Sequence, residues 1–245
     1  SDVCSSDLIY YSSGQRANRI LIIFMKQLVI MCGGKGTRLK KLKNKNPKCL
    51  LKINKKTLLE YQIILAKKFK FKSIILLTGY KSSLINNFLK KKKLFANIKI
   101  IKDKKNLGNG SALMNAINYL DDEFFLIYCD ILTKINLKKF YTFSKKKNSD
   151  LSLVVNKNSN FEDSNLVTLN KNQMINNFYF YPHKKFPKNC YSNEAIFICK
   201  KNKLLMIKKK FYEKEADFVK DIIPKLLKKI KIFGYKTSEY IIDCG

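Results

Sequence analysis

The chain has 245 residues and is 46% hydrophobic, which is enough to bury the core of one large domain. Its formal charge of +32 would ordinarily indicate a nucleic acid or an anionic membrane as partner, but the lysines are spread along the whole chain and form no basic and aromatic platform. We therefore expect no specific nucleic-acid partner. We also expect no membrane partner, because no apolar run approaches the roughly 20 residues of a membrane-spanning helix.

Residues 1–24 differ from the rest of the chain because they contain no lysine, and Met25 directly precedes a strand-like run. We expect this stretch to be a non-native or disordered N-terminal extension, with Met25 as the native start. A signal peptide is the alternative, but the apolar run at 20–24 is short and no small-residue cleavage site follows it.

From Met25 onward, short apolar runs alternate with longer amphipathic segments. The first half predicts strands at 27–32, 73–78, 98–101 and 124–129. It predicts helices at 57–69, with Thr57 as cap, at 82–89 and at 111–120. This alternation predicts an α/β fold with a Rossmann-like three-layer α/β/α architecture and a mixed, mostly parallel central sheet.

The second half changes character after Asp130 and continues without a long linker. It predicts strands at 151–155, 166–169, 175–180, 195–199, 231–233 and 240–242. Helices are predicted at 136–144, 203–210 and 217–229. We expect this half to extend the first half's sheet as a lobe that covers one ligand.

A glycine-rich loop follows the first predicted strand. It contains Gly33, Gly34 and Gly36, and also Arg38, which is the one arginine outside the N-terminal extension in a chain with 47 lysines. A guanidinium can hold a phosphate through two parallel hydrogen bonds, and glycine lets backbone amides approach an anion. The loop has neither the Walker A ending nor the dinucleotide spacing of glycines. Lys48, which follows Pro47, supplies the second cation that a triphosphate requires.

Two aspartates end predicted strands, Asp130 after 124–129 and Asp243 after 240–242. Each could simply form a turn or cap. The functional interpretation is that both carboxylates converge on Mg²⁺, which proteins usually bind through one or two carboxylates plus substrate phosphates.

The seven cysteines form no CxxC pair and have no zinc-ligand spacing with His183, the only histidine. Most lie in apolar strand-like contexts, so we interpret them as small buried side chains in a reducing cytoplasm.

Several of these motifs occur together in the order and spacing of a known family. They are GGKGTRL at 33–39, Pro47-Lys48, NLGNGSAL at 106–113, Tyr128-Cys129-Asp130, SNEAI at 192–196 and IDCG at 242–245. Over residues 25–245 the chain resembles the sugar-1-phosphate nucleotidyltransferases, most of all the short bacterial enzymes that act on heptose 1-phosphate or related hexose 1-phosphates. The ending is similar to forms that are fused to a heptose-bisphosphate phosphatase.

The resemblance implies transfer of a nucleotidyl group from an NTP to a heptose-, mannose- or glucose-1-phosphate, with release of pyrophosphate. The NDP-sugar product would serve cell-surface glycan synthesis, such as that of lipopolysaccharide, and no covalent enzyme intermediate is needed. By the family pattern, the triphosphate is held by Gly33, Gly34, Gly36, Thr37 and Arg38. Lys48 neutralises charge where the two phosphates meet, and Asp130 and Asp243 hold Mg²⁺. The base and ribose lie among Gly79, Gly108 and Gly110, and the sugar faces Asn193 and Glu194.

The chain departs from the family pattern at three places. Cys129 stands where the family usually has Gly, the Glu-Lys-Pro segment of many relatives is not evident, and the chain stops at Gly245 where relatives continue. We therefore expect residues 25–245 to be a nucleotidyltransferase domain with a truncated C-terminus, in the cytoplasm, with a homo-oligomer and a fused phosphatase domain as open expectations. A non-catalytic regulatory relative that binds a sugar nucleotide is the alternative, and a basic nucleic-acid-binding protein is the weaker one.

Overall fold

The computed structural model describes residues 26–33, 46–94, 97–103, 105–157, 161–183 and 185–244. The predicted N-terminal extension and four predicted site residues, namely Gly34, Gly36, Thr37 and Arg38, lie outside these described residues. Across the described ranges, no helix is both long and apolar enough to cross a membrane.

The centre of the sheet is parallel. Strand β1 (Gln27–Met31) pairs with β4 (Ser73–Thr78) on one side and β6 (Glu123–Tyr128) on the other, and β5 (Ile98–Lys102) follows β4. All four strands consist mainly of apolar residues, and β1 is buried along its whole length. The carboxyl ends of these strands therefore meet at one edge of the sheet.

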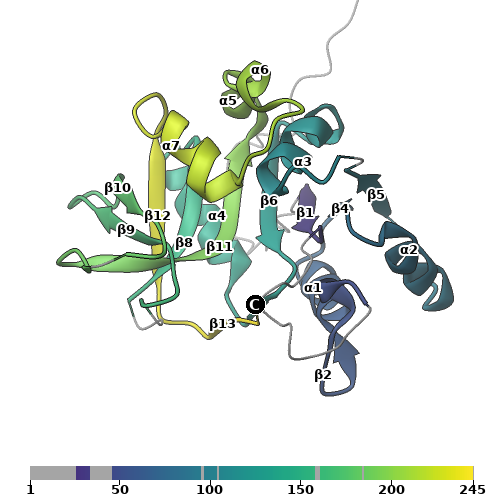
Figure 1. Cartoon of the computed structure of the whole chain (residues 1–245). Coiled ribbons are helices and arrows are strands. Elements are labelled where there is room, and N and C mark those ends of the chain that lie inside the picture. The colour runs from purple at the N-terminus through teal and green to yellow at the C-terminus, as the bar shows by residue number, and fades with distance from the viewer. Residues whose placement is uncertain are drawn as a thin grey trace, which may run out of the picture.

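The second half of the chain extends this sheet beyond β6 (Figure 1). The long strand β11 (Cys190–Lys200) runs antiparallel to β6 and pairs with β8 (Leu151–Asn156) and β9 (Leu166–Leu169). Strand β10 (Ile175–Tyr179) runs antiparallel to β9, and β12 (Ile232–Thr237) runs parallel to β8. Among the described strands of this sheet, β10 and β11 thus run against the direction of the other seven, which confirms the mixed, mostly parallel sheet.

Helices cover both faces of the sheet, because successive strand residues point to opposite sides. Leu28 and Ile30 of β1 face a core that also contains side chains of α1 (Leu58–Lys68), α2 (Ser82–Lys91) and α4 (Leu137–Lys146). Val29 and Met31 face the opposite core. That core is completed by α3 (Asn109–Ala116), the 3-10 turn η3 (Ile117–Tyr119), α5 (Lys201–Leu205), α6 (Lys208–Phe211), the π turn η4 (Phe218–Ile222) and α7 (Ile223–Leu226). The predicted three-layer architecture is confirmed.

Local sequence explains where α1 begins. The Thr57 hydroxyl accepts a hydrogen bond from the Glu60 N–H at 3.2 Å, and the Glu60 carboxylate accepts one from the Thr57 N–H at 2.7 Å. This capping box satisfies two N–H groups that a helix start leaves without partners, and it confirms Thr57 as the cap.

Some elements differ from the prediction. The predicted helix at 217–229 is the π turn η4 followed by the short α7, because Pro224 has no N–H to donate to the preceding turn. The predicted strand at 195–199 begins earlier, at Cys190. Three short strands were not predicted: β2 (Lys52–Ile53), β3 (Lys56–Thr57) and β7 (Ile131–Thr133), of which β7 pairs with β13 (Ile241–Asp243).

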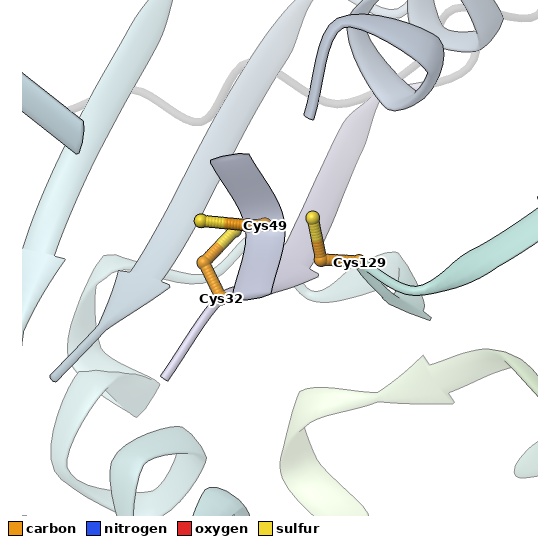
Figure 2. Close-up of side chains that lie close together, drawn as sticks. All are labelled: Cys32, Cys49 and Cys129. Atoms are coloured by element: carbon orange, nitrogen blue, oxygen red, sulfur yellow. The ribbon is translucent and has the colours of Figure 1, made fainter. Parts of the chain in front are cut away.

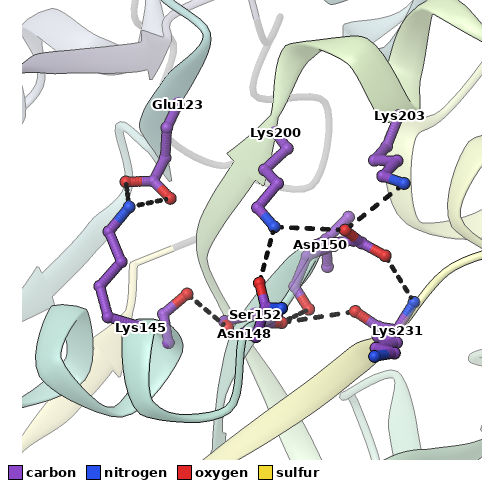
Figure 3. Close-up of polar contacts among 11 residues, drawn as sticks. Glu123, Lys145, Asn148, Asp150, Ser152, Lys200, Lys203 and Lys231 are labelled. Atoms are coloured by element: carbon purple, nitrogen blue, oxygen red, sulfur yellow. Dashed lines mark hydrogen bonds and ion pairs between the residues drawn. The ribbon is translucent and has the colours of Figure 1, made fainter.

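Polar contacts hold the amino ends of β6 and β8 (Figure 3). The Asp150 carboxylate, just before β8, lies 3.4 Å from the Lys200 ammonium and 3.6 Å from that of Lys203, and it accepts the Lys231 N–H at 3.0 Å. Glu123, the first residue of β6, pairs with Lys145 of α4 at 2.7 Å. This edge is opposite to the one where the parallel strands end.

Candidate functional site

The candidate site lies at the carboxyl edge of the parallel strands. Gly33, Gly79, Asp103 and Asp130 each follow a strand of the parallel group within two residues. Open α/β sheets bind their ligands at this edge. Two cavities lie there, and both are lined by Met31, Gly33 and Asn109, so they adjoin each other.

The larger cavity has a volume of about 300 Å³ and lies between the ends of β1 and β4 and the start of α3. It is lined by Met31, Gly33, Leu77, Thr78, Gly79, Asp103, Asn106, Gly108, Asn109 and Ala112. Among the described residues of that lining, Asp103 is the one with a charged side chain. A mostly apolar, concave surface with few polar groups is typical of sites for small organic ligands.

The loop after β5 positions Asp103, which is largely buried. Its N–H donates to the Thr78 carbonyl at 2.7 Å, and its carboxylate accepts the N–H groups of Lys105 at 3.3 Å and Leu107 at 3.2 Å. A carboxylate has about four lone-pair sites, so it can accept further hydrogen bonds from a ligand. We did not single out Asp103 from the sequence, although an acidic residue at a predicted strand end was the available signal.

The predicted glycines have two different roles: Gly33 leaves space for a ligand, and the other three allow close packing of the chain. A methyl group on Gly33 would lie 3.7 Å from its nearest neighbour, so this glycine keeps space open in both cavities. Gly79 also lines the larger cavity, and a methyl group there would lie 2.5 Å from the Asn106 side-chain oxygen. Gly108 has φ +95°, and a methyl group on it would lie 2.5 Å from the Ala216 carbonyl oxygen. A methyl group on Gly110 would lie 2.8 Å from the backbone of 217–218.

Hydrogen bonds of Asn109, which lines both cavities, join the start of α3 to the start of η4, and we call these contacts the clamp. The Asn109 side chain donates to the Asp217 carboxylate at 2.7 Å and accepts the Phe218 N–H at 2.6 Å. Asp217 also caps η4 by accepting the N–H groups of Val219 and Lys220, both at 2.8 Å. Segments more than a hundred residues apart in sequence are joined here.

The smaller cavity, of about 100 Å³, brings Lys48 and Asp130 together. Their side chains form a hydrogen-bonded ion pair, with 14% of the Lys48 side chain and 21% of the Asp130 side chain exposed. Buried Gln62 of α1 supports this loop by donating to the carbonyls of Cys129 at 3.3 Å and Ile131 at 2.5 Å. Gln62 could not be singled out from the sequence, because its role depends on the packing of α1.

The backbone of Asp243 lies beside that of Asp130, and the predicted convergence of the two carboxylates on Mg²⁺ stays a prediction. It pairs with Ile131 across the β7 and β13 ladder, and the Cys244 N–H donates to the Asp130 carbonyl at 3.0 Å. Two aspartates that end separate strands thus have neighbouring backbones, although Asp130 lines the smaller cavity and Asp243 does not.

Tyr128 lines the smaller cavity with a hydroxyl that is buried and has no hydrogen-bond partner among the described residues. Burial raises the pKa of this phenol well above its usual value, and the nearby carboxylates of Asp217 and Asp130 raise it further. The group is therefore a neutral hydroxyl that can donate a hydrogen bond to a ligand.

Asn193 and Glu194 occupy an irregular stretch of β11. The register against β8 shifts between Asn193 and Phe197, and Ala195 has φ +52°. The Ser192 hydroxyl donates to the Glu194 carboxylate, and the Asn193 side-chain oxygen accepts the Ala195 N–H at 3.2 Å. Because Ile196 pairs with Ile127, both residues lie near the end of β6 that leads to Asp130, but neither lines the two cavities.

Comparisons with known proteins agree with this geometry. A family model described as nucleotidyl transferase matches residues 27–241. A D-glycero-alpha-D-manno-heptose 1-phosphate guanylyltransferase of Campylobacter jejuni is 28% identical over 219 residues, which cover 89% of this chain and 94% of that protein. A bifunctional GlmU protein of Methanocaldococcus jannaschii is 29% identical, over 89% of this chain and 50% of its own length. The crystal structure of HddC from Yersinia pseudotuberculosis complexed with GMP-PN superimposes with a TM-score of 0.72 at 24% identity, over 89% of this chain and 93% of that one.

Proposed function

The chain belongs to the nucleotidyl transferase family, and from this premise we propose that it transfers a guanylyl group from GTP to a heptose 1-phosphate or a related sugar 1-phosphate. The guanylyltransferase relative, similar over nearly its whole length, supports both substrates. The observation that carries the proposal is the pair of adjoining cavities, one with Asp103 and the other with Lys48 and Asp130.

Asp103 supports guanine as the base. Guanine presents two adjacent donors, the ring N1–H and the 2-amino group, and a carboxylate can accept both in parallel. Uracil, thymine, cytosine and adenine do not present this pair of donors on one edge. Asp103 is the one charged side chain among the described residues of the larger cavity's lining, so it can supply this selectivity.

The smaller cavity supports phosphate transfer. A sugar phosphate oxygen attacks the α-phosphorus, the bond from that phosphorus to the bridging oxygen breaks, and pyrophosphate leaves. Lys48 would neutralise charge where the two phosphates meet, and Gly33 leaves room for them. The protein's contribution to such a transfer is mainly positioning and charge stabilisation. Arg38 and the other glycines of its loop remain proposed triphosphate ligands.

The acidic residues at this edge fit a magnesium ion. Asp130 and Asp243 offer carboxylate oxygens from neighbouring backbone positions, which is the donor type that Mg²⁺ prefers. When bound, the ion would neutralise phosphate charge. The Asp130 carboxylate pairs with the Lys48 ammonium in this structure. Substrate binding would draw Lys48 toward phosphate and leave the carboxylate for the metal ion.

Asn193 and Glu194 are proposed to face the sugar. They lie at the same edge as Asp130, on a bulged strand, and bulges commonly direct side chains toward active sites. Tyr128 is a further candidate, because its buried hydroxyl needs a partner. Because the substrates are metabolites of the cytoplasm, we propose that compartment for the protein.

A pyrophosphate-release screen tests the proposal. GTP, CTP, UTP, dTTP and ATP would each be combined with heptose-, mannose-, glucose- and N-acetylhexosamine-1-phosphate in the presence of Mg²⁺. We expect release with GTP and a heptose or mannose 1-phosphate. Release with another base alone would refute guanine selection. Nucleotide binding without release from any pair would favour the non-catalytic relative.

A further inference from the structure

Three cysteine side chains of the smaller cavity's lining lie close together (Figure 2). The sulfur atoms of Cys32, Cys49 and Cys129 all lie within 4.8 Å of one another. Each residue is buried, with at most 4% of its surface exposed, and all three belong to the lining of the cavity. We call these residues the thiol cluster.

The fold explains how the thiol cluster forms. Met31 pairs with Tyr128, so Cys32 and Cys129 are the next residues at the ends of adjacent parallel strands, and the Cys129 N–H donates to the Met31 carbonyl at 3.2 Å. Cys49 comes from the 3-10 helix η2 (Lys48–Leu50), a separate segment. The cluster therefore depends on tertiary structure, and the sequence spacing gave no sign of it.

We propose that the thiol cluster is a binding site for a thiophilic metal ion, of the class of Zn²⁺, Cd²⁺ or Cu⁺. Thiolates select such ions over hard cations. A tetrahedral ion with metal to sulfur bonds of about 2.3 Å requires sulfur atoms about 3.8 Å apart. The sulfur atoms thus need to move by no more than about 1 Å. A water molecule in the adjoining cavity can supply a fourth ligand.

The thiol cluster is distinct from the proposed magnesium site. Mg²⁺ prefers oxygen ligands, which Asp130 and Asp243 offer at the protein surface, whereas the sulfur ligands lie beneath it. Yet each cysteine is next in sequence to a residue of the smaller cavity, namely Gly33, Lys48 or Asp130. A soft ion in the cluster would therefore fix the backbone that carries these residues. The proposal does not depend on the substrates, since it concerns binding by the free protein.

Titration of the reduced 245-residue chain with Cd²⁺ tests the proposal. With a non-thiol reductant and excess Mg²⁺ present, we expect the ultraviolet charge-transfer absorption of a cadmium thiolate to saturate at one equivalent. Cys32→Ser, Cys49→Ser and Cys129→Ser should each weaken binding at least tenfold. Cys199→Ser is the matched control, because Cys199 is also buried but lies in β11 away from the cluster. The Cd²⁺ affinity of the Cys199→Ser variant should equal that of the unmodified chain.

X-ray absorption spectroscopy of the Zn²⁺ adduct gives a second measurement that needs no variant. We expect three sulfur atoms in the coordination shell at about 2.3 Å. A coordination shell of oxygen or nitrogen alone would overturn the proposal. So would the absence of a cadmium thiolate signal in the unmodified chain, or cadmium affinity in all three cluster variants equal to that of the unmodified chain.

Discussion

Asp103 is the residue at which the choice of base can be tested. Asp103→Asn keeps one acceptor but replaces the other with an amide donor, so a guanine edge would lose a charge-assisted hydrogen bond and meet a like donor. Such a bond is worth about 1.5–3 kcal/mol, which corresponds to roughly a 10- to 100-fold fall in kcat/KM for GTP.

The comparison with the other nucleotides is the control for Asp103. Its carboxylate also holds two loop N–H groups, so loosening of the loop would lower kcat/KM for every NTP by a similar factor. We expect the ratio of GTP to UTP turnover to fall. An unchanged ratio would contradict base recognition by Asp103.

Asp130 and Asp150 make a matched pair of carboxylates, both paired with lysine but at opposite edges of the sheet. Asp130→Asn should lower kcat by about 100-fold or more, because it removes charge that would hold the metal near the phosphates. The free energy of unfolding should change by less than about 1 kcal/mol, since a partly exposed ion pair contributes little. Pyrophosphate release and urea denaturation, measured on both Asn variants, check this. Near-normal turnover in Asp130→Asn would refute the metal role.

Arg38 stands out in the sequence because it is the one arginine in residues 25–245, where lysines are abundant. It lies outside the described residues, and its role on the triphosphate stays a prediction.

Two glycines at the ends of secondary-structure elements should respond differently to the same substitution. Gly108→Ala places a methyl group 2.5 Å from the Ala216 carbonyl oxygen at φ +95°, so it should lower the free energy of unfolding by about 2 kcal/mol or more through strain and overpacking. Among the described residues, Gly33→Ala meets no atom closer than 3.7 Å, so stability should hold while the methyl group intrudes on the cavities and lowers kcat/KM.

Urea denaturation measures the stability of each variant, and pyrophosphate release, assayed where both variants are folded, measures its activity. Equal destabilisation of both variants would show that the clamp between α3 and η4 does not require Gly108. Full activity in Gly33→Ala would place the phosphates elsewhere.

The elements of the parallel core were predictable because each depends on its own sequence. Strand β4 begins and ends as predicted, and Thr57 caps α1. The π turn η4 and the bulge in β11 were not predictable, because Asn109 holds the start of η4 and the register of β11 depends on two neighbouring strands.

Lysines far outnumber acidic residues across the molecule, and several lysines can therefore share one carboxylate. Asp150 gathers two ammonium groups and the Lys231 N–H at the amino edge of the sheet (Figure 3). Burial by itself would raise the pKa of Asp150, but the hydrogen bonds from Lys231 and Lys200 and the charge of Lys203 outweigh it, so this pKa is below its usual value.

This pKa gives stability a defined dependence on pH. Because the pKa is lower in the folded than in the unfolded chain, the carboxylate stabilises the fold above pH of about 4, and the contribution is lost as pH falls from there through the folded value. Asp150→Asn should lower the free energy of unfolding by about 1 kcal/mol at pH 7. The difference should shrink below pH 4, as urea denaturation at both values would show. A difference that does not change with pH would contradict the assignment.

Strand periodicity and motif order are local properties, so the amino-acid sequence was enough to predict the fold class and the family and to select Lys48, Asp130 and Asp243 as candidate site residues. The homo-oligomer, the fused phosphatase domain and the nature of residues 1–24 stay predictions. Tertiary structure alone decided that Asp103 enters the larger cavity, that Gly108 serves the clamp between α3 and η4, and that three cysteine side chains lie close together. The physical reason is that each of these depends on how separate segments pack, and sequence spacing does not record which segments will be neighbours.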